Sequence, residues 1–218
     1  YTWVQRKMPA IGKWFFSPLI VSRTPFLLAS IEDFEFGGIK GSMRTWKSLG
    51  QWAWELNKGL DQLGEAEKKR VAELTSGLKS DREKAEALYR YMQSRTRYAS
   101  IQLGIGGYKP APAMEVSEKG YGDCKGLTNY MYALLREAGI TSHYTWVRAG
   151  TNKSIIPAFV SDQFDHIILC VPLQGDTVWL ECTSQTQPFN FLGSFTCDRD
   201  VLLITPDGGK MVRTPPFS

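Results

Sequence analysis

The stretch from Asp123 to Gly139 constrains the fold of this chain most, because it predicts a helix that has to be buried. Apolar residues recur along it at the spacing of one helix face: Leu127, Met131, Leu134, Leu135 and Ala138. Asp123 suits the N-cap and Gly139 the C-terminal cap. Helical patterns precede this stretch and β-rich runs follow it, so the sequence predicts an α+β fold with an antiparallel sheet.

Cys124 follows the expected N-cap directly, within the run from Gly122 to Gly126. Its sulfur is therefore expected in the first helical turn, at the positive end of the helix dipole, where a thiolate is favoured. A thiolate is a strong nucleophile, but it needs a base and a group that orients this base. A lone cysteine at a helix start is more often structural. The Asp-Cys-Lys context with a downstream histidine and acid favours a catalytic role or its relic.

The candidate base is His166 and the candidate orienting acid is Glu181, on two successive β-rich runs. Between the runs, Pro172 to Gly175 has turn chemistry. A four-residue loop pairs Val171 with Asp176 and sets His166 directly opposite Glu181, so that both project from one face. A two-residue turn would make the pair diagonal but keep the face, whereas a three-residue loop would put Glu181 on the wrong side.

Two further residues belong to the candidate site. His143 is the rival base, because its expected strand follows the nucleophile helix closely; we favour His166, since only His166 has a hairpin partner acid. Gln102 lies in the glycine-rich loop before the nucleophile and is the candidate oxyanion donor beside the backbone N–H of Cys124. The alternative for Gln102 is a loop residue that bonds the backbone.

Gly-Asp-Cys-Lys at a helix start, followed by a strand histidine and a strand acid, resembles the transglutaminase-like superfamily of papain-type cysteine enzymes. Segments 80–84, 98–107 and 120–125 are similar to those of bacterial proteins that join an N-terminal β-sandwich, the domain of unknown function 3857, to such a core. The resemblance extends from residue 42 to the C-terminus. It departs at Glu181, where the superfamily usually has Asp.

This resemblance implies a papain-like core in residues 42–218, with the nucleophile helix packed on the sheet, and makes residues 1–41 a linker or extension from an N-terminal β-sandwich domain. It implies acyl transfer from a peptide or protein amide through a Cys-His-Glu triad and a thioester, without a cofactor, at the periplasm or cell surface of a Gram-negative bacterium. Hydrolysis by a peptidase or amidase and transamidation by a transglutaminase-type enzyme both stay open. The alternative is an inactive module that binds a peptide or glycan.

The remaining sequence features mainly exclude functions. A net charge of +4 over 218 residues, without a basic cluster, does not indicate nucleic-acid binding. No apolar run is long enough to span a membrane. Two histidines and no Cys-x-x-Cys pair argue against a structural zinc site.

In the expected hairpin Cys170 and Cys182 point to opposite faces, so they should not form a disulfide. The chain begins without Met, as if inside a strand, so we expect it to be part of a longer protein.

The expected elements follow from periodicity and turn residues. Helices are predicted from 46 to 56, from 65 to 78 and after the capping box that starts at Ser80. A long loop is expected from 97 to 118, and strands are expected near 142–147, 164–171, 177–183 and 201–204.

Overall fold

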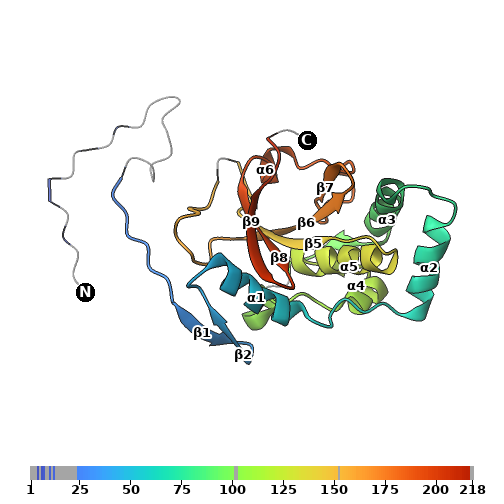
Figure 1. The fold of residues 1–218 in the computed structure, drawn as a ribbon, viewed down its shortest axis with the longest axis horizontal. Helices are drawn as coiled ribbons and strands as arrows, with labels where there is room; N and C mark the ends of the chain where they lie inside the picture. Colours follow the sequence, from blue (N-terminus) through green and yellow to red (C-terminus); the bar gives the residue numbers. More distant parts are fainter. Residues whose placement is uncertain are drawn as a thin grey trace.

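The computed structural model describes residues 4, 6, 7, 10, 12, 24–100, 103–151 and 153–216. Its centre is a five-stranded antiparallel sheet in the order β7-β6-β5-β8-β9 (Figure 1). Its strands are β5 (His143–Val147), β6 (His166–Leu173), β7 (Asp176–Leu180), β8 (Asp200–Thr205) and β9 (Gly208–Arg213).

Most of the helices precede this sheet in the sequence. They are α1 (Trp46–Asn57), α2 (Glu65–Thr75), α3 (Asp81–Arg95), α4 (Ala113–Lys119) and α5 (Cys124–Glu137), with a short α6 (Gly193–Thr196) between β7 and β8. The smaller elements are a hairpin of β1 (Asp33–Phe36) and β2 (Ile39–Ser42), a parallel pair of β3 (Arg97–Tyr98) and β4 (Tyr121–Gly122), and the 3₁₀ turn η2 (Gly104–Gly107). The expected α+β architecture is confirmed.

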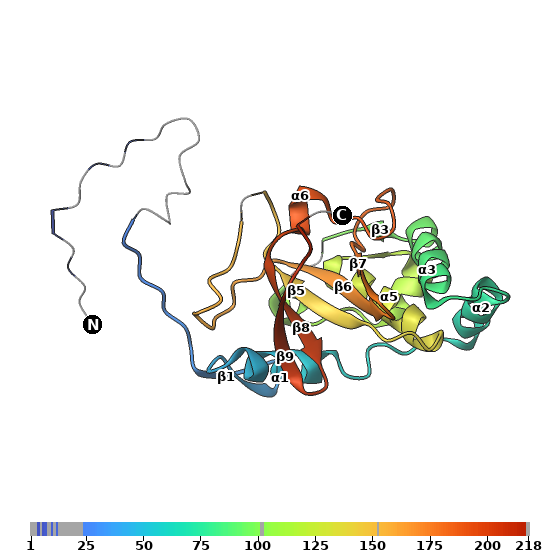
Figure 2. The same cartoon turned by 45° about the horizontal axis from the view of Figure 1, so that its top comes forward.

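The two faces of the sheet are covered differently (Figures 1 and 2). Helices α1 and α5 pack on the face that carries Trp146, Leu169 and Leu202. The opposite face carries Ile168 and Leu203 and is covered by the segment around α6. The sheet is therefore buried on both sides, which explains why its central strands lack a clear polar and apolar alternation.

Helix α5 is the centre of the helical layer. Eleven of its 14 residues are buried, Thr128 and Asn129 among them, so it is enclosed on nearly every side. The Asn129 amide donates to the carbonyls of Leu60 (2.8 Å) and Ala111 (3.1 Å), which satisfies a polar group that would otherwise be costly to bury. The predicted helix is confirmed, including Gly139, which follows it with a φ of 75°.

The expected loop from 97 to 118 is wrong in part, because it contains η2 and α4. Helix α4 has only seven residues, too few for a periodic pattern, and it is fixed by burying Ala113 and Val116 against α5. Strand β9 was also not predicted. Its Gly209 lets α1 approach so closely that a Cβ on Gly50 would lie 2.1 Å from the Gly209 Cα. Glycine weakens a strand signal, but here it permits the contact.

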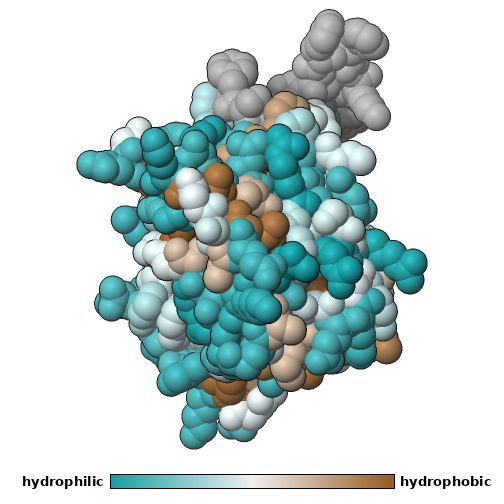
Figure 3. All heavy atoms as spheres, turned by 90° about the vertical axis from the view of Figure 1, so that its right-hand side faces the viewer, coloured by the Kyte–Doolittle hydropathy of each residue, from teal (hydrophilic) through white to brown (hydrophobic). Residues whose placement is uncertain are grey.

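The outer surface adds two observations. Hydrophilic side chains cover most of the end of the molecule that carries α2 and α3 (Figure 3). Among the described residues, no helix has the length and apolarity needed to cross a membrane.

Candidate active site

Cys124 is the first residue of α5, and this residue is 4% exposed. The expected N-cap is confirmed, since Oδ1 of Asp123 accepts a hydrogen bond from the Gly126 N–H at 2.9 Å. The other carboxylate oxygen of Asp123 forms an ion pair with the buried ammonium of Lys125. Packing also favours glycine at position 126, because a Cβ there would lie 3.3 Å from a methyl group of Val116 in α4.

His166 and Glu181 meet at the edge of the sheet. Nε2 of His166 lies 2.8 Å from Oε2 of Glu181. The four-residue loop expected between their strands is wrong, because Leu173 pairs with Asp176 and only two residues form the turn, with Gly175 at a φ of 77°. The pair is therefore diagonal, which is the arrangement expected for a two-residue turn.

Glu181 is held as a carboxylate. Its second oxygen, Oε1, accepts hydrogen bonds from the N–H (3.1 Å) and hydroxyl (2.6 Å) of Thr183. Burial alone would raise the pKa of Glu181, but the hydrogen bond and charge of His166, together with Thr183, outweigh it and lower the pKa.

His166 is correspondingly stabilised as an imidazolium. Burial opposes its charge, but hydrogen bonds to Cys124 and Glu181 and their charges raise the pKa of His166 to about 10. Because Nε2 faces Glu181, Nδ1 is the ring nitrogen left for the sulfur of Cys124. The ring also makes an edge contact with Phe195, with the centroids 5.3 Å apart.

Two side chains of helix α3 hydrogen-bond to the backbone at and after Glu181, and the sequence did not predict these contacts. The Tyr89 hydroxyl donates to the backbone carbonyl of Glu181 at 2.8 Å. The Gln93 amide donates to the carbonyls of Ser184 and Gln187, both at 2.9 Å. The one signal available in the sequence was the Tyr89 hydroxyl, which needs a partner when buried.

The other predicted site residues lie elsewhere. In the ladder between β5 and β6, His143 lies opposite Cys170, whereas His166 lies opposite Val147. Val147 is four residues from His143 along β5, so the position opposite His166 is about 13 Å from His143. Burial, followed by the charge of Lys210, lowers the pKa of His143. Gln102 lies outside the described residues.

All four cysteines are free. Cys170 and Cys182 belong to hydrophobic clusters on opposite faces of the sheet, as expected. Burial raises the pKa of Cys170 to about 12 and raises that of Cys182 as well. Neither is therefore a competing nucleophile near neutral pH.

A cavity of about 290 Å³ opens beside Cys124. Besides Cys124 and His166, its lining includes three aromatic and three charged side chains: Tyr108, Trp146, Phe164, Lys125, Asp162 and Asp165. Among the described residues, no group of three or more His, Cys, Asp or Glu side chains is arranged to hold a metal ion.

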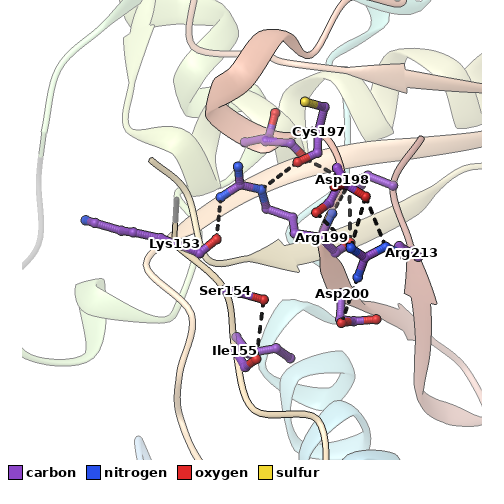
Figure 4. A network of polar contacts seen from close by, with 10 residues as sticks. Lys153, Ser154, Ile155, Cys197, Asp198, Arg199, Asp200 and Arg213 are labelled. Atoms are coloured by element: carbon purple, nitrogen blue, oxygen red, sulfur yellow. Dashed lines mark hydrogen bonds and ion pairs between the residues drawn. The ribbon is translucent and has the colours of Figure 1, made fainter. Parts of the chain in front are cut away.

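A buried arginine anchors the segment that leads to this cavity (Figure 4). The guanidinium of Arg199 donates to the carbonyls of Arg148, Gly150, Lys153, Ser194 and Cys197, at 2.8–2.9 Å. Three of these acceptors lie at the start of the segment between β5 and β6, which carries Asp162 and Phe164 and ends at His166. The arginine thus ties this segment to the α6 side of the molecule.

Comparison with known proteins agrees with this architecture. The profile of the transglutaminase-like superfamily matches residues 68–187, more than half of the chain, and the chain belongs to this superfamily. No protein with a curated description matches the sequence.

Two solved structures are similar. One is a candidate protease from Parabacteroides distasonis, with a TM-score of 0.58, 18% identity and 77% of this chain covered. The other is a candidate cysteine protease from Cytophaga hutchinsonii, with a TM-score of 0.45, 12% identity and 71% covered. The chain spans 31% and 50% of the lengths of those two proteins. At this identity the first likeness shows the fold.

Proposed function

We propose that this protein is a cysteine-dependent acyl-transfer enzyme that acts on an amide through Cys124, His166 and Glu181. The observation that carries this proposal is the position of the His166 ring, which hydrogen-bonds to Glu181 and lines the same cavity as Cys124, a cysteine at a helix N-terminus. A nucleophile, a base and an oriented acid in series are the requirements of papain-type chemistry.

In the proposed reaction, the Cys124 thiolate attacks the amide carbon and forms a C–S bond, while the carbonyl electrons move to the oxygen. The His166 imidazolium then gives its proton to the amide nitrogen as the C–N bond breaks, which releases an amine and leaves a thioester. His166, now neutral, takes a proton from water or from an acceptor amine, which attacks the thioester and expels the thiolate. Glu181 keeps a proton on Nε2 throughout, so that Nδ1 serves the sulfur.

The oxyanion requires donors beside the sulfur. The backbone N–H of Cys124 lies in the first helical turn, where N–H groups have no intrahelical acceptor, so it can serve as one donor. Gln102 remains our candidate for the second.

The resemblance noted above also implies a preceding β-sandwich of the domain of unknown function 3857 and a periplasmic or cell-surface location, which stay predictions.

The competing hypothesis is an inactive module whose cleft binds a peptide or glycan. Iodoacetamide labelling near neutral pH separates the two, with intact-mass detection in a Cys197→Ser background. An enzyme should label fast and only at Cys124, and His166→Ala should slow this labelling strongly. Labelling of Cys124 no faster than that of the buried Cys170 would support the inactive module.

The type of reaction needs a second measurement. A peptide library with an added primary amine, followed by mass spectrometry, distinguishes hydrolysis from amine incorporation. Cys124→Ser is the control that must abolish either product.

A further inference from the structure

The cavity beside Cys124 has an aromatic wall. Trp146 is at its centre, with ring centroids 6.4 Å from Tyr108 and 5.8 Å from Phe164. Trp146 also packs edge-on against Trp52 of α1, at 6.3 Å, so α1 and the sheet hold the wall rigidly. The faces of such rings are negative and attract cations, tryptophan most strongly.

Most charged groups around this wall already have a partner of opposite charge. Asp165 accepts a hydrogen bond from the Ala149 N–H (2.7 Å) and pairs with Arg148 (3.5 Å) and Lys153 (3.9 Å). Lys125 is neutralised by Asp123.

Asp162 differs from these groups. Its Oδ2 accepts the Tyr108 hydroxyl at 2.5 Å, and among the described residues it takes part in no ion pair. Burial, followed by Asp162, raises the pKa of Tyr108 to about 12, so this partner is a neutral donor. Within the described part of the chain, Asp162 is therefore a carboxylate in the lining of an aromatic cavity that has a neutral donor but no cation as its partner.

We propose that this cavity binds a cationic group of the substrate, an ammonium or guanidinium, next to the amide that Cys124 attacks. The inference rests on the proposed function, because it takes Cys124 as the nucleophile. A cation can lie against Trp146 and pair with Asp162, and it gains from both contacts. An anion would face the Asp162 carboxylate, and a neutral apolar group would desolvate this carboxylate without a compensating partner.

The size of the cavity agrees with a single side chain. Its volume of about 290 Å³ lies at the lower limit of ligand pockets, which run from about 300 to 1,000 Å³. It adjoins Cys124 and His166 directly, so a bound side chain would belong to a residue close to the reacting amide.

Three thiol reagents of different charge test the inference without a known substrate. They are methanethiosulfonates with an aminoethyl, an ethyl or a sulfonatoethyl group, which share the same leaving group. We would measure second-order rates at Cys124 by intact mass in a Cys197→Ser background at low salt, normalised to a free thiol. The cationic reagent should exceed the neutral one by on the order of tenfold, and the anionic reagent should be slowest.

The decisive variant is Asp162→Asn, which should bring the ratio of cationic to neutral rates close to that of the free thiol. Tyr108→Phe keeps the charge of Asp162 and should keep the preference. Asp176→Asn makes the same chemical change at the far end of the β6–β7 hairpin and should leave the ratio unchanged. Melting curves establish that each variant is folded.

The failure of this inference differs from the failure of the proposed function. Fast labelling of Cys124 with equal charge preference in wild type and Asp162→Asn would overturn the cationic site alone. Labelling of Cys124 no faster than that of Cys170 by every reagent would overturn the proposed function and this inference with it.

Discussion

His166 and Glu181 lie diagonally across the β6–β7 hairpin and still bring Nε2 within 2.8 Å of Oε2. The ladder pairs Leu169 with Leu180, so the same register sets residue 183, not 181, opposite His166. Diagonal Cα atoms are about 7–8 Å apart, against about 5 Å for facing ones. The extra methylene of Glu, relative to the Asp usual in the superfamily, spans this larger offset.

The first prediction concerns the length of this acid. Glu181→Asp should slow turnover and Cys124 labelling by roughly tenfold, because the shorter carboxylate cannot reach Nε2 across the diagonal without moving the backbone. Iodoacetamide kinetics and a melting curve measure reactivity and stability separately. Equal or higher reactivity in the Asp variant would mean that the length of Glu181 is tolerated rather than required.

The charge of Glu181 is a separate test. Glu181→Gln keeps the length but removes the negative charge that fixes the proton on Nε2. We expect a folded protein with a loss of turnover on the order of 10²-fold or more. If neither Glu181 variant changes Cys124 reactivity while His166→Ala abolishes it, the acid role belongs to another polar group near His166.

Tyr89 should act through the position of Glu181. Tyr89→Phe removes the donor to the Glu181 carbonyl and leaves a buried acceptor unsatisfied, at a cost of about 1–3 kcal/mol in the free energy of unfolding. Labelling of Cys124 should slow moderately. Tyr91→Phe is the matched control on the same helix, since the Tyr91 hydroxyl makes a long 3.4 Å contact with Glu67 and none with the Glu181 backbone. Equal effects of both variants would contradict a positioning role for Tyr89.

The sequence was sufficient for the elements with a strong local signal. The Asp123 cap and the apolar face of α5 predict the position of Cys124, because both depend on neighbouring residues only. The turn between β6 and β7 was harder to predict. Pro172 suggested a loop, yet it belongs to β6, where β5 has already ended opposite Cys170 and no ladder hydrogen bond to β5 is lost.

Long-range polar contacts to backbone carbonyls could not be predicted from the sequence. Arg199 finds three of its five acceptors on carbonyls about 50 residues away, and backbone carbonyls carry no side-chain signal. The same holds for the absence of an ion pair at Asp162 among the described residues, because the cations Arg148 and Lys153 pair with Asp165 instead.

Arg199 provides a prediction of stability. Arg199→Lys keeps the charge, but an ammonium has three donors and cannot satisfy five carbonyls. Each acceptor left unsatisfied costs about 1–3 kcal/mol, so urea unfolding should reveal a loss of several kcal/mol. Arg213→Lys is the control, because its exposed ion pairs are worth about 0–1 kcal/mol. Similar losses in both variants would show that the carbonyl cluster contributes little.

The last prediction concerns the pH dependence of stability. The pKa of His166 is raised from an ordinary value of 6.5 to about 10 in the folded protein, so the unfolded chain loses this proton first. The stabilisation from His166 is therefore fully present below about pH 6.5 and is lost as the pH rises toward 10. The lowered pKa of Glu181 acts in the opposite direction, because its contribution is lost as the pH falls through its folded-state value.

Urea unfolding at pH 6, 8 and 10 measures the loss of stability as the pH rises. Glu181→Gln should flatten the slope, because the raised pKa of His166 depends in part on the charge and hydrogen bond of Glu181. His143→Gln is the control: the lowered pKa of His143 makes its contribution present at high pH and lost as the pH falls, so its removal should leave the alkaline slope unchanged. Lysine, tyrosine and cysteine titrations are common to the wild type and both variants, so the difference in slope isolates His166. An alkaline slope that Glu181→Gln leaves unchanged would mean that the imidazolium of His166 is not held by this carboxylate.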